Sequence, residues 1–131
     1  LGVPHYLVAS AAQLVLTHID LGDIELARDV FIKAVDTAIE HDKQEGYMFT
    51  LIAGIALAHA DNHLSHAQNW LAFINSIPES FATLSEEIAK QNELITLPNS
   101  EQTLSATTMT EEEKIATLRN MLTDAQALLA K

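Results

Sequence analysis

Apolar residues recur every three or four positions in six successive segments of the chain, which is the spacing of one face of an α-helix. Polar or glycine-containing stretches separate these segments. The first three predicted helices run from Pro4 to Gly22, from Asp23 to the polar run 41–44, and from Tyr47 to Ala60. The fourth follows a break at Asp61-Asn62 and has the apolar stripe Leu64, Ala67, Leu71 and Ile74. The last two run from Ser76 to Pro98 and from Thr110 to Leu129. We therefore predict an all-α fold of about six helices.

Local sequence signals predict where several of these helices begin and end. Asp23 is a typical N-cap residue for the second helix. Ser76 to Glu79 and Thr110 to Glu113 each have the form of a capping box, which predicts the starts of the fifth and sixth helices. The sixth helix is amphipathic. Its predicted inward residues are Ile115, Leu118, Met121, Leu122, Ala125, Leu128 and Leu129.

Gly54 lies in the middle of the third predicted helix, in a line of small residues that includes Ala53 and Ala56. A glycine at such a position costs about 1 kcal/mol relative to alanine. We therefore expect that a neighbouring element packs closely against Gly54 and offsets this cost.

The first 78 residues contain an internal repeat with a period of 40 residues. A shift by this period places Gly22 over Asn62, and it places Val15 over Ile55 and Phe31 over Leu71. Glycine and asparagine are the residues best suited to a left-handed backbone at a helix C-terminus. Each unit is therefore predicted to be a helix, a tight turn at Gly22 or Asn62, and a second helix that stacks on its neighbour.

The segment Leu21 to Ala27, followed by Phe31 and Ala34, resembles the G-D-x-x-x-A, aromatic, alanine signature of tetratricopeptide (TPR) repeats. The period is longer than the usual TPR period and is similar to that of extended TPR-like repeats in bacterial regulatory ATPases and transcription activators. The resemblance covers about residues 5 to 78. It implies antiparallel helix hairpins. The sequence also departs from the TPR signature, for example with Asn62 at the second turn, so a plain helical bundle is the alternative.

The resemblance also implies that the first helix of each pair lines a groove that binds a partner. In the first repeat the implied groove residues are Ala12, Gln13, Leu16, Ile19 and Asp20. In the second repeat they are Phe49, Ile52, Ala53, Ala56 and His59. This surface is mainly apolar, and it lacks the lysine and asparagine pattern with which some TPR proteins bind a C-terminal carboxylate.

These segments suggest three parts of the chain. Residues 1–97 form the predicted TPR-like domain, residues 98–110 a polar linker, and residues 111–131 an amphipathic helix. The apolar face of that last helix must be covered. We expect the helix either to pack on the repeat, where it would plug the groove, or to pack on a partner chain, which would give a homodimer if the partner is a second copy.

The charge and composition exclude several classes of partner. The formal net charge is −11 and the few basic residues are scattered, which argues against nucleic acid and anionic membranes. The two most apolar runs have 14 residues each, and a membrane span needs about 20. The start Leu1-Gly2-Val3-Pro4 lacks an initiator Met and a basic flank, which suggests a fragment of a longer protein and no signal peptide. The lack of cysteine fits either redox compartment, and we expect a cytoplasmic location.

The candidate chemistry of the sequence consists of histidines and acidic clusters. His59, His63 and His66 have ligand-like spacing, but the turn at Asn62 separates the first from the other two, so we expect no metal and no cofactor. The run 111–113 of glutamates suits the first turn of a helix because of the helix dipole. Trp70 is expected in the core. No nucleophile or phosphate-binding motif is present, so we do not expect an enzyme.

The sequence therefore predicts a non-catalytic interaction or sensor module of a larger regulatory protein, which binds a helix or peptide of another protein in an apolar groove. Three alternatives remain at this stage. The first is a dimerisation domain. The second is a helical-bundle sensor of a small ligand, which needs an internal cavity lined by Gly54 and the alanines near it. The third is a metal-dependent hydrolase built on helices, which needs the histidines to converge.

Overall fold

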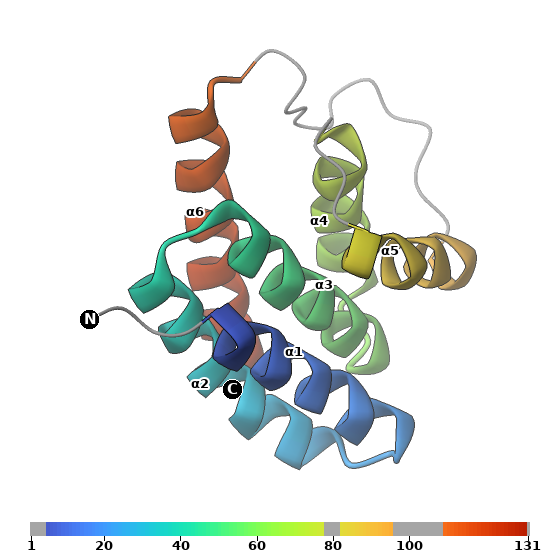
Figure 1. Cartoon of the computed structure of the whole chain (residues 1–131). Helices are drawn as coiled ribbons and strands as arrows, with labels where there is room; N and C mark the ends of the chain where they lie inside the picture. Colours follow the sequence, from blue (N-terminus) through green and yellow to red (C-terminus); the bar gives the residue numbers. More distant parts are fainter. Residues whose placement is uncertain (1–4, 78–81, 96–108, 131) are drawn as a thin grey trace.

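The computed structural model describes residues 5–77, 82–95 and 109–130. Within these ranges the chain is all-helical and has no strand, which confirms the predicted fold class. The first pair of helices is α1 (His5–Asp20) and α2 (Ile24–His41), and the second pair is α3 (Gln44–Ala60) and α4 (Leu64–Ser76). Two further helices follow, α5 (Ala82–Leu94) and α6 (Glu111–Leu129) (Figure 1).

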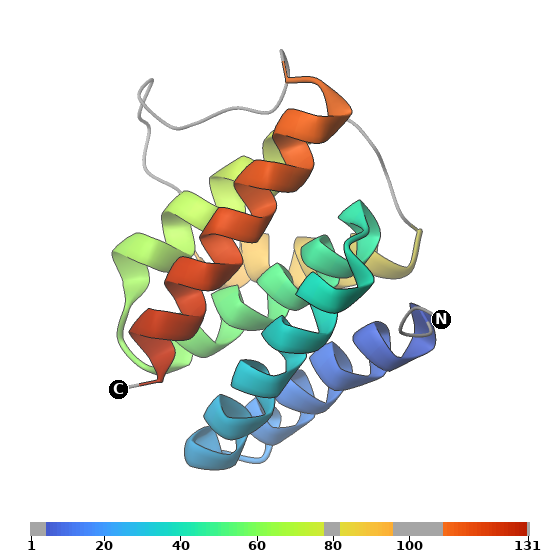
Figure 2. The ribbon, with the colours of Figure 1, turned by 90° about the vertical axis from the view of Figure 1, so that its left-hand side faces the viewer.

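Helix α3 is the centre of the fold. It contacts α1, α2, α4, α5 and α6, and almost every residue from Gln44 to Ala58 is buried. A helix that is apolar on all sides is stable only when other elements surround it. Helices α5 and α6 lie on opposite sides of α3 (Figures 1 and 2). The core therefore forms around one helix with several covering helices.

The turns at Gly22 and Asn62 have the same backbone structure. Both residues have a left-handed conformation, with φ of 78° and 65°. The N–H groups of Gly22 and Asp23 donate to the carbonyls of Ile19 and His18, and those of Asn62 and His63 donate to the carbonyls of His59 and Ala58. This is the pair of bonds of a Schellman motif. The two predicted turn positions are therefore equivalent, 40 residues apart.

Several details of the predicted helix ends differ from the structure. Helix α3 begins at Gln44 instead of Tyr47, because the left-handed Asp42 ends α2 and the chain enters the next helix at once. Asp23 is at the N-cap of α2 as predicted, but its side chain makes no capping hydrogen bond. Helix α5 ends at Leu94, before Pro98. The predicted start of α5 lies partly outside the described residues, and within them Ser76 is the last residue of α4.

Helix α6 begins with the capping box that the sequence predicts. The backbone N–H of Glu113 donates to the Thr110 hydroxyl (3.2 Å), and the N–H of Thr110 donates to the Glu113 carboxylate (3.3 Å). The helix packs against α2 and α3. Its fully buried apolar residues are Leu118, Leu122, Ala125 and Leu129. Gln126 adds hydrogen bonds to the Ile32 carbonyl (2.9 Å) and to Asp36 (3.0 Å) of α2.

Gly54 packs tightly against Phe31 of α2, as its position in the sequence predicts. A Cβ atom on Gly54 would lie 2.8 Å from Cζ and 2.9 Å from Cε1 of the buried Phe31 ring. The space next to Gly54 is therefore filled, and the cavity that a small-ligand sensor would need is not at this position.

We expect Gly54→Ala to lower the free energy of unfolding by about 1 kcal/mol, because the clash with Phe31 outweighs the gain in helix propensity. Urea denaturation measures this change. The same substitution in a Phe31→Leu background is the control, and there it is expected to be neutral or stabilising, since the ring is gone. A stabilising effect of Gly54→Ala alone would contradict the close packing.

Among the residues that the structure describes, no helix combines the length and the apolar character that a membrane span requires.

Candidate functional site

The structure buries much of the groove surface that the TPR resemblance implies. Ala12, Ile52 and Ala53 lie in the core, Leu16 and Ala56 are 7% exposed, and Phe49, Ile19 and His59 are half-buried. Gln13 and Asp20 are exposed. The open apolar surface is therefore smaller than the resemblance implies, and both α1 and α5 contact α3.

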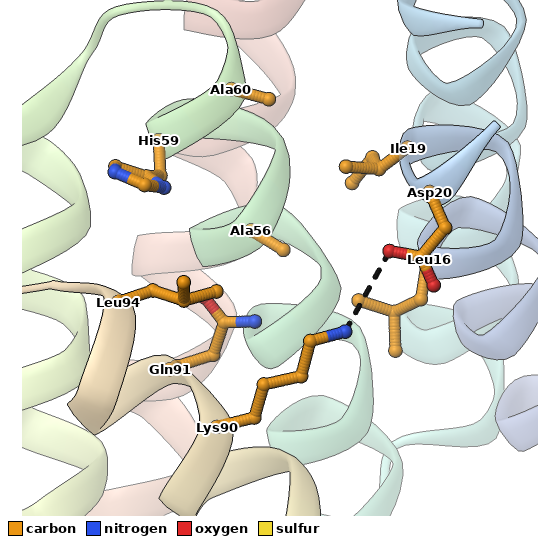
Figure 3. Close-up of a pocket in the computed structure, with 9 residues that line it drawn as sticks. All are labelled: Leu16, Ile19, Asp20, Ala56, His59, Ala60, Lys90, Gln91 and Leu94. Atoms are coloured by element: carbon orange, nitrogen blue, oxygen red, sulfur yellow. Dashed lines mark ion pairs between the residues drawn. The ribbon is translucent and has the colours of Figure 1, made fainter. Parts of the chain in front are cut away.

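A cleft of about 80 Å³ remains between α1, α3 and α5 (Figure 3). Its apolar walls are formed by Leu16, Ile19, Ala56, Ala60 and Leu94. Its polar residues are Asp20, His59, Lys90 and Gln91. The cleft thus joins the first helices of the two pairs and contains residues from both predicted halves of the groove.

Sequence reasoning missed the contribution of α5 to this site, which consists of Lys90, Gln91 and Leu94. One signal was available. Gln91 follows Ile88 by three residues and precedes Ile95 by four, so a polar side chain interrupts the apolar face of this helix. The structure buries Gln91, whereas Leu94 next to it is 53% exposed.

The amide of Gln91 is incompletely hydrogen-bonded. Its Nε2 donates to the Glu87 carboxylate (3.0 Å). Its Oε1 is buried and has no hydrogen-bond partner among the described residues. A buried acceptor without a donor costs about 1–3 kcal/mol, which makes Gln91 an unfavourable residue for packing alone.

We expect Gln91→Leu to raise the free energy of unfolding by about 1 kcal/mol, because an apolar side chain of similar size removes the unbonded oxygen. The matched control is Gln13→Leu at an exposed position of α1, where the change is expected to stay within about 0.5 kcal/mol. Both values come from urea denaturation. A clear loss of stability in Gln91→Leu would contradict this expectation. It would mean that the Gln91 amide makes stabilising hydrogen bonds beyond the one to Glu87.

Lys90 and Asp20 form an ion pair between α5 and α1, with Nζ 3.6 Å from Oδ1 (Figure 3). The side chains are 45% and 66% exposed. An exposed pair of this kind contributes at most about 1 kcal/mol. It nevertheless shows that an ammonium group is accommodated beside Asp20 at the cleft.

A second polar cluster links α6 to the turn between α2 and α3. The Tyr47 hydroxyl donates to Asp42 Oδ1 (2.5 Å), and Arg119 donates to Tyr47 Oη (3.2 Å) and to Asp42 Oδ1 (2.5 Å). These hydrogen bonds lower the pKa of Asp42, that from Tyr47 most. Burial, followed by the bond to Asp42, raises the pKa of Tyr47. A phenol with a raised pKa is a poor nucleophile or base at neutral pH, so this cluster is best explained as an attachment of α6.

The three histidines with ligand-like spacing lie in different surroundings. His59 lines the cleft. His63 lies 3.6 Å from Asp61, which also accepts a hydrogen bond from Arg28 (2.9 Å). The ring of His66 is 5.6 Å from that of Trp70, which is buried as expected. In the described part of the chain no three histidine or acidic side chains are grouped so that they could hold a metal ion.

Comparisons of the chain with protein-family models, with curated proteins and with solved structures gave no significant match. The functional argument therefore depends on the cleft and on the charge of the surface around it.

Proposed function

We propose that the chain is a non-catalytic, TPR-like interaction module of a larger regulatory protein, which binds a helix of another protein across the mouth of the α1–α3–α5 cleft. The observation that carries this proposal is the position of the cleft. It lies between α1 and α3, the first helices of two pairs that have equivalent turns, and this is where a TPR-like groove would be.

The cleft suits one face of a helix. Ile19 and Leu94 provide partly exposed apolar surface at its edges, with Leu16 and Ala56 beneath them. A guest helix can place apolar residues at positions i, i+3, i+4 and i+7 against such a surface. The net charge of −11 favours basic residues that flank these positions, because complementary charge speeds association and selects among partners.

The alternatives receive less support from the geometry. A small-ligand site usually has about 300–1,000 Å³, whereas this cleft has about 80 Å³ and the space at Gly54 is filled. Dimerisation through α6 would require its apolar face, which is buried against α2 and α3 of the same chain.

Selection from a displayed library of amphipathic helical peptides tests the proposal. We expect enriched peptides to combine the apolar spacing with basic flanks, and we expect Ile19→Glu at the cleft to weaken their binding at least tenfold. The control is Leu26→Glu, which places the same charge on a 41% exposed leucine of α2. An equal loss in both variants, or the absence of enriched peptides, contradicts the proposed site.

A further inference from the structure

We propose that α5 is a displaceable cover of the helix-binding surface, and that a partner helix binds when α5 moves away from α3. This inference rests on the proposed function and adds regulation to the same site. With α5 in place, the cleft has a volume of about 80 Å³, which corresponds to about two or three water molecules. A guest helix brings several apolar side chains. The cleft is too small for them unless its α5 wall moves.

Few buried apolar side chains hold α5 in place. Among the described side chains from residue 85 to residue 95, one apolar side chain, Ile95, is fully buried, and Ile88 is half-buried. Helix α6, by contrast, has four fully buried apolar residues. Because burial of apolar surface is the main favourable term in packing, less free energy holds α5 on α3 than holds α6.

The polar contacts of α5 add little to this. Gln91 Oε1 is buried without a hydrogen-bond partner among the described residues, and it gains water as a partner when α5 moves. Lys90 and Asp20 form an exposed ion pair, and the amides of Asn75 and Asn92 exchange two exposed hydrogen bonds of 2.8 and 3.1 Å. Water competes for all of these groups. Gln91 thus favours the open form, and the other contacts oppose it weakly.

The movement of α5 uncovers a surface that suits an apolar guest. Leu16 of α1 and Ala56 of α3 are each 7% exposed and line the cleft beside α5 (Figure 3). Glu86, Asn92 and Glu93 of α5 are exposed already, so this polar face of the helix stays in water in both forms. A partner helix replaces the apolar contacts that α5 gives up, and it therefore selects the open form.

Native-state hydrogen exchange of the full chain, without any peptide, measures the opening of α5. We expect the amides of residues 88–94 to exchange at least 100-fold faster than those in the middle of α3, because they open locally and not only through global unfolding. Equal protection of the two helices would overturn the proposal, since α5 would then leave α3 only when the whole protein unfolds.

Two variants of α5 connect this opening to binding. Gln91→Leu is expected to slow the exchange of α5 about fivefold, and Ile88→Ala is expected to speed it at least fivefold. The affinity for a peptide from the library selection is expected to fall in Gln91→Leu and to rise in Ile88→Ala by the same factors, because the apparent dissociation constant varies inversely with the open fraction. The matched control is Ile115→Ala, which changes a half-buried isoleucine of α6 and is expected to leave both quantities unchanged.

The two proposals can fail separately. If peptides bind at the cleft with the same affinity in the wild type, Gln91→Leu and Ile88→Ala, the interaction module stands and the cover is wrong. If α5 exchanges as expected but no peptide is enriched, the opening stands as a property of α5, whereas the proposed function and the regulation that depends on it are overturned.

Discussion

Leu122→Ala is expected to lower the free energy of unfolding by about 2–5 kcal/mol, because it leaves a cavity where α6 packs on the body of the protein. Leu122 is 0% exposed and belongs to the same core as the residues of α3. The control is Leu26→Ala, which removes the same atoms at a 41% exposed site and is expected to cost about 0.5 kcal/mol or less.

Urea denaturation at two protein concentrations measures this effect and its origin. If α6 packs on its own chain, the denaturation midpoint does not depend on concentration. A small effect of Leu122→Ala, or a midpoint that rises with concentration, would mean that the last helix packs on another chain, which was the other possibility indicated by the sequence.

Asp42→Ala is expected to lower the free energy of unfolding by about 2–3 kcal/mol, through two separate causes. The buried Tyr47 hydroxyl loses its acceptor, which costs about 1–2 kcal/mol. Asp42 also has φ of 52°, and an alanine is less favourable than an aspartate in this left-handed conformation.

Two further variants separate these causes. Asp42→Gly removes the carboxylate but adopts the left-handed conformation freely, so it is expected to cost about 1 kcal/mol less than Asp42→Ala. In a Tyr47→Phe background Asp42→Ala is expected to cost less than in the wild type, since no hydroxyl is left without an acceptor. Additive effects of the two substitutions would contradict the hydrogen bond.

The pH dependence of this cluster follows from the directions of its pKa shifts. The pKa of Asp42 is lowered from 3.8, so its contribution is complete above that pH and is lost as the pH falls through the folded-state pKa. The pKa of Tyr47 is raised from 10.0, so the contribution of its neutral form is complete below that pH and is lost as the pH rises through the folded-state value. The difference in stability between wild type and Asp42→Ala is therefore expected to be constant at neutral pH and to shrink in acid below 3.8.

The features that the sequence predicted correctly depend on residues close together in the chain. The turns at Gly22 and Asn62 follow from two residues that tolerate positive φ, and the capping box at Thr110 from a pair three positions apart. Gly54 was interpretable because a mid-helix glycine has few explanations other than close packing. In each case the physical cause is local.

The features that the sequence did not predict depend on contacts between distant segments. Helix α3 includes Gly46, which packs closely against Val8 of α1: a Cβ on Gly46 would lie 3.0 Å from that side chain. Helix α6 buries Lys114, paired with Glu111 at 3.3 Å, whereas Ile115, Met121 and Leu128 are half-buried. The buried face of α6 is thus rotated slightly about the helix axis relative to the predicted face. The cleft depends on where α5 packs, which no periodicity within α5 specifies.

NMR mapping of Leu, Ile and Ala methyl groups with a peptide from the library selection tests the central claim most directly. We predict that the largest shifts occur at Leu16, Ile19, Ala56 and Leu94, which line the cleft, and that the exposed Leu26 and Leu64 do not shift. Shifts centred on α6, or on the outer side of α2, would place the binding surface elsewhere and contradict the account.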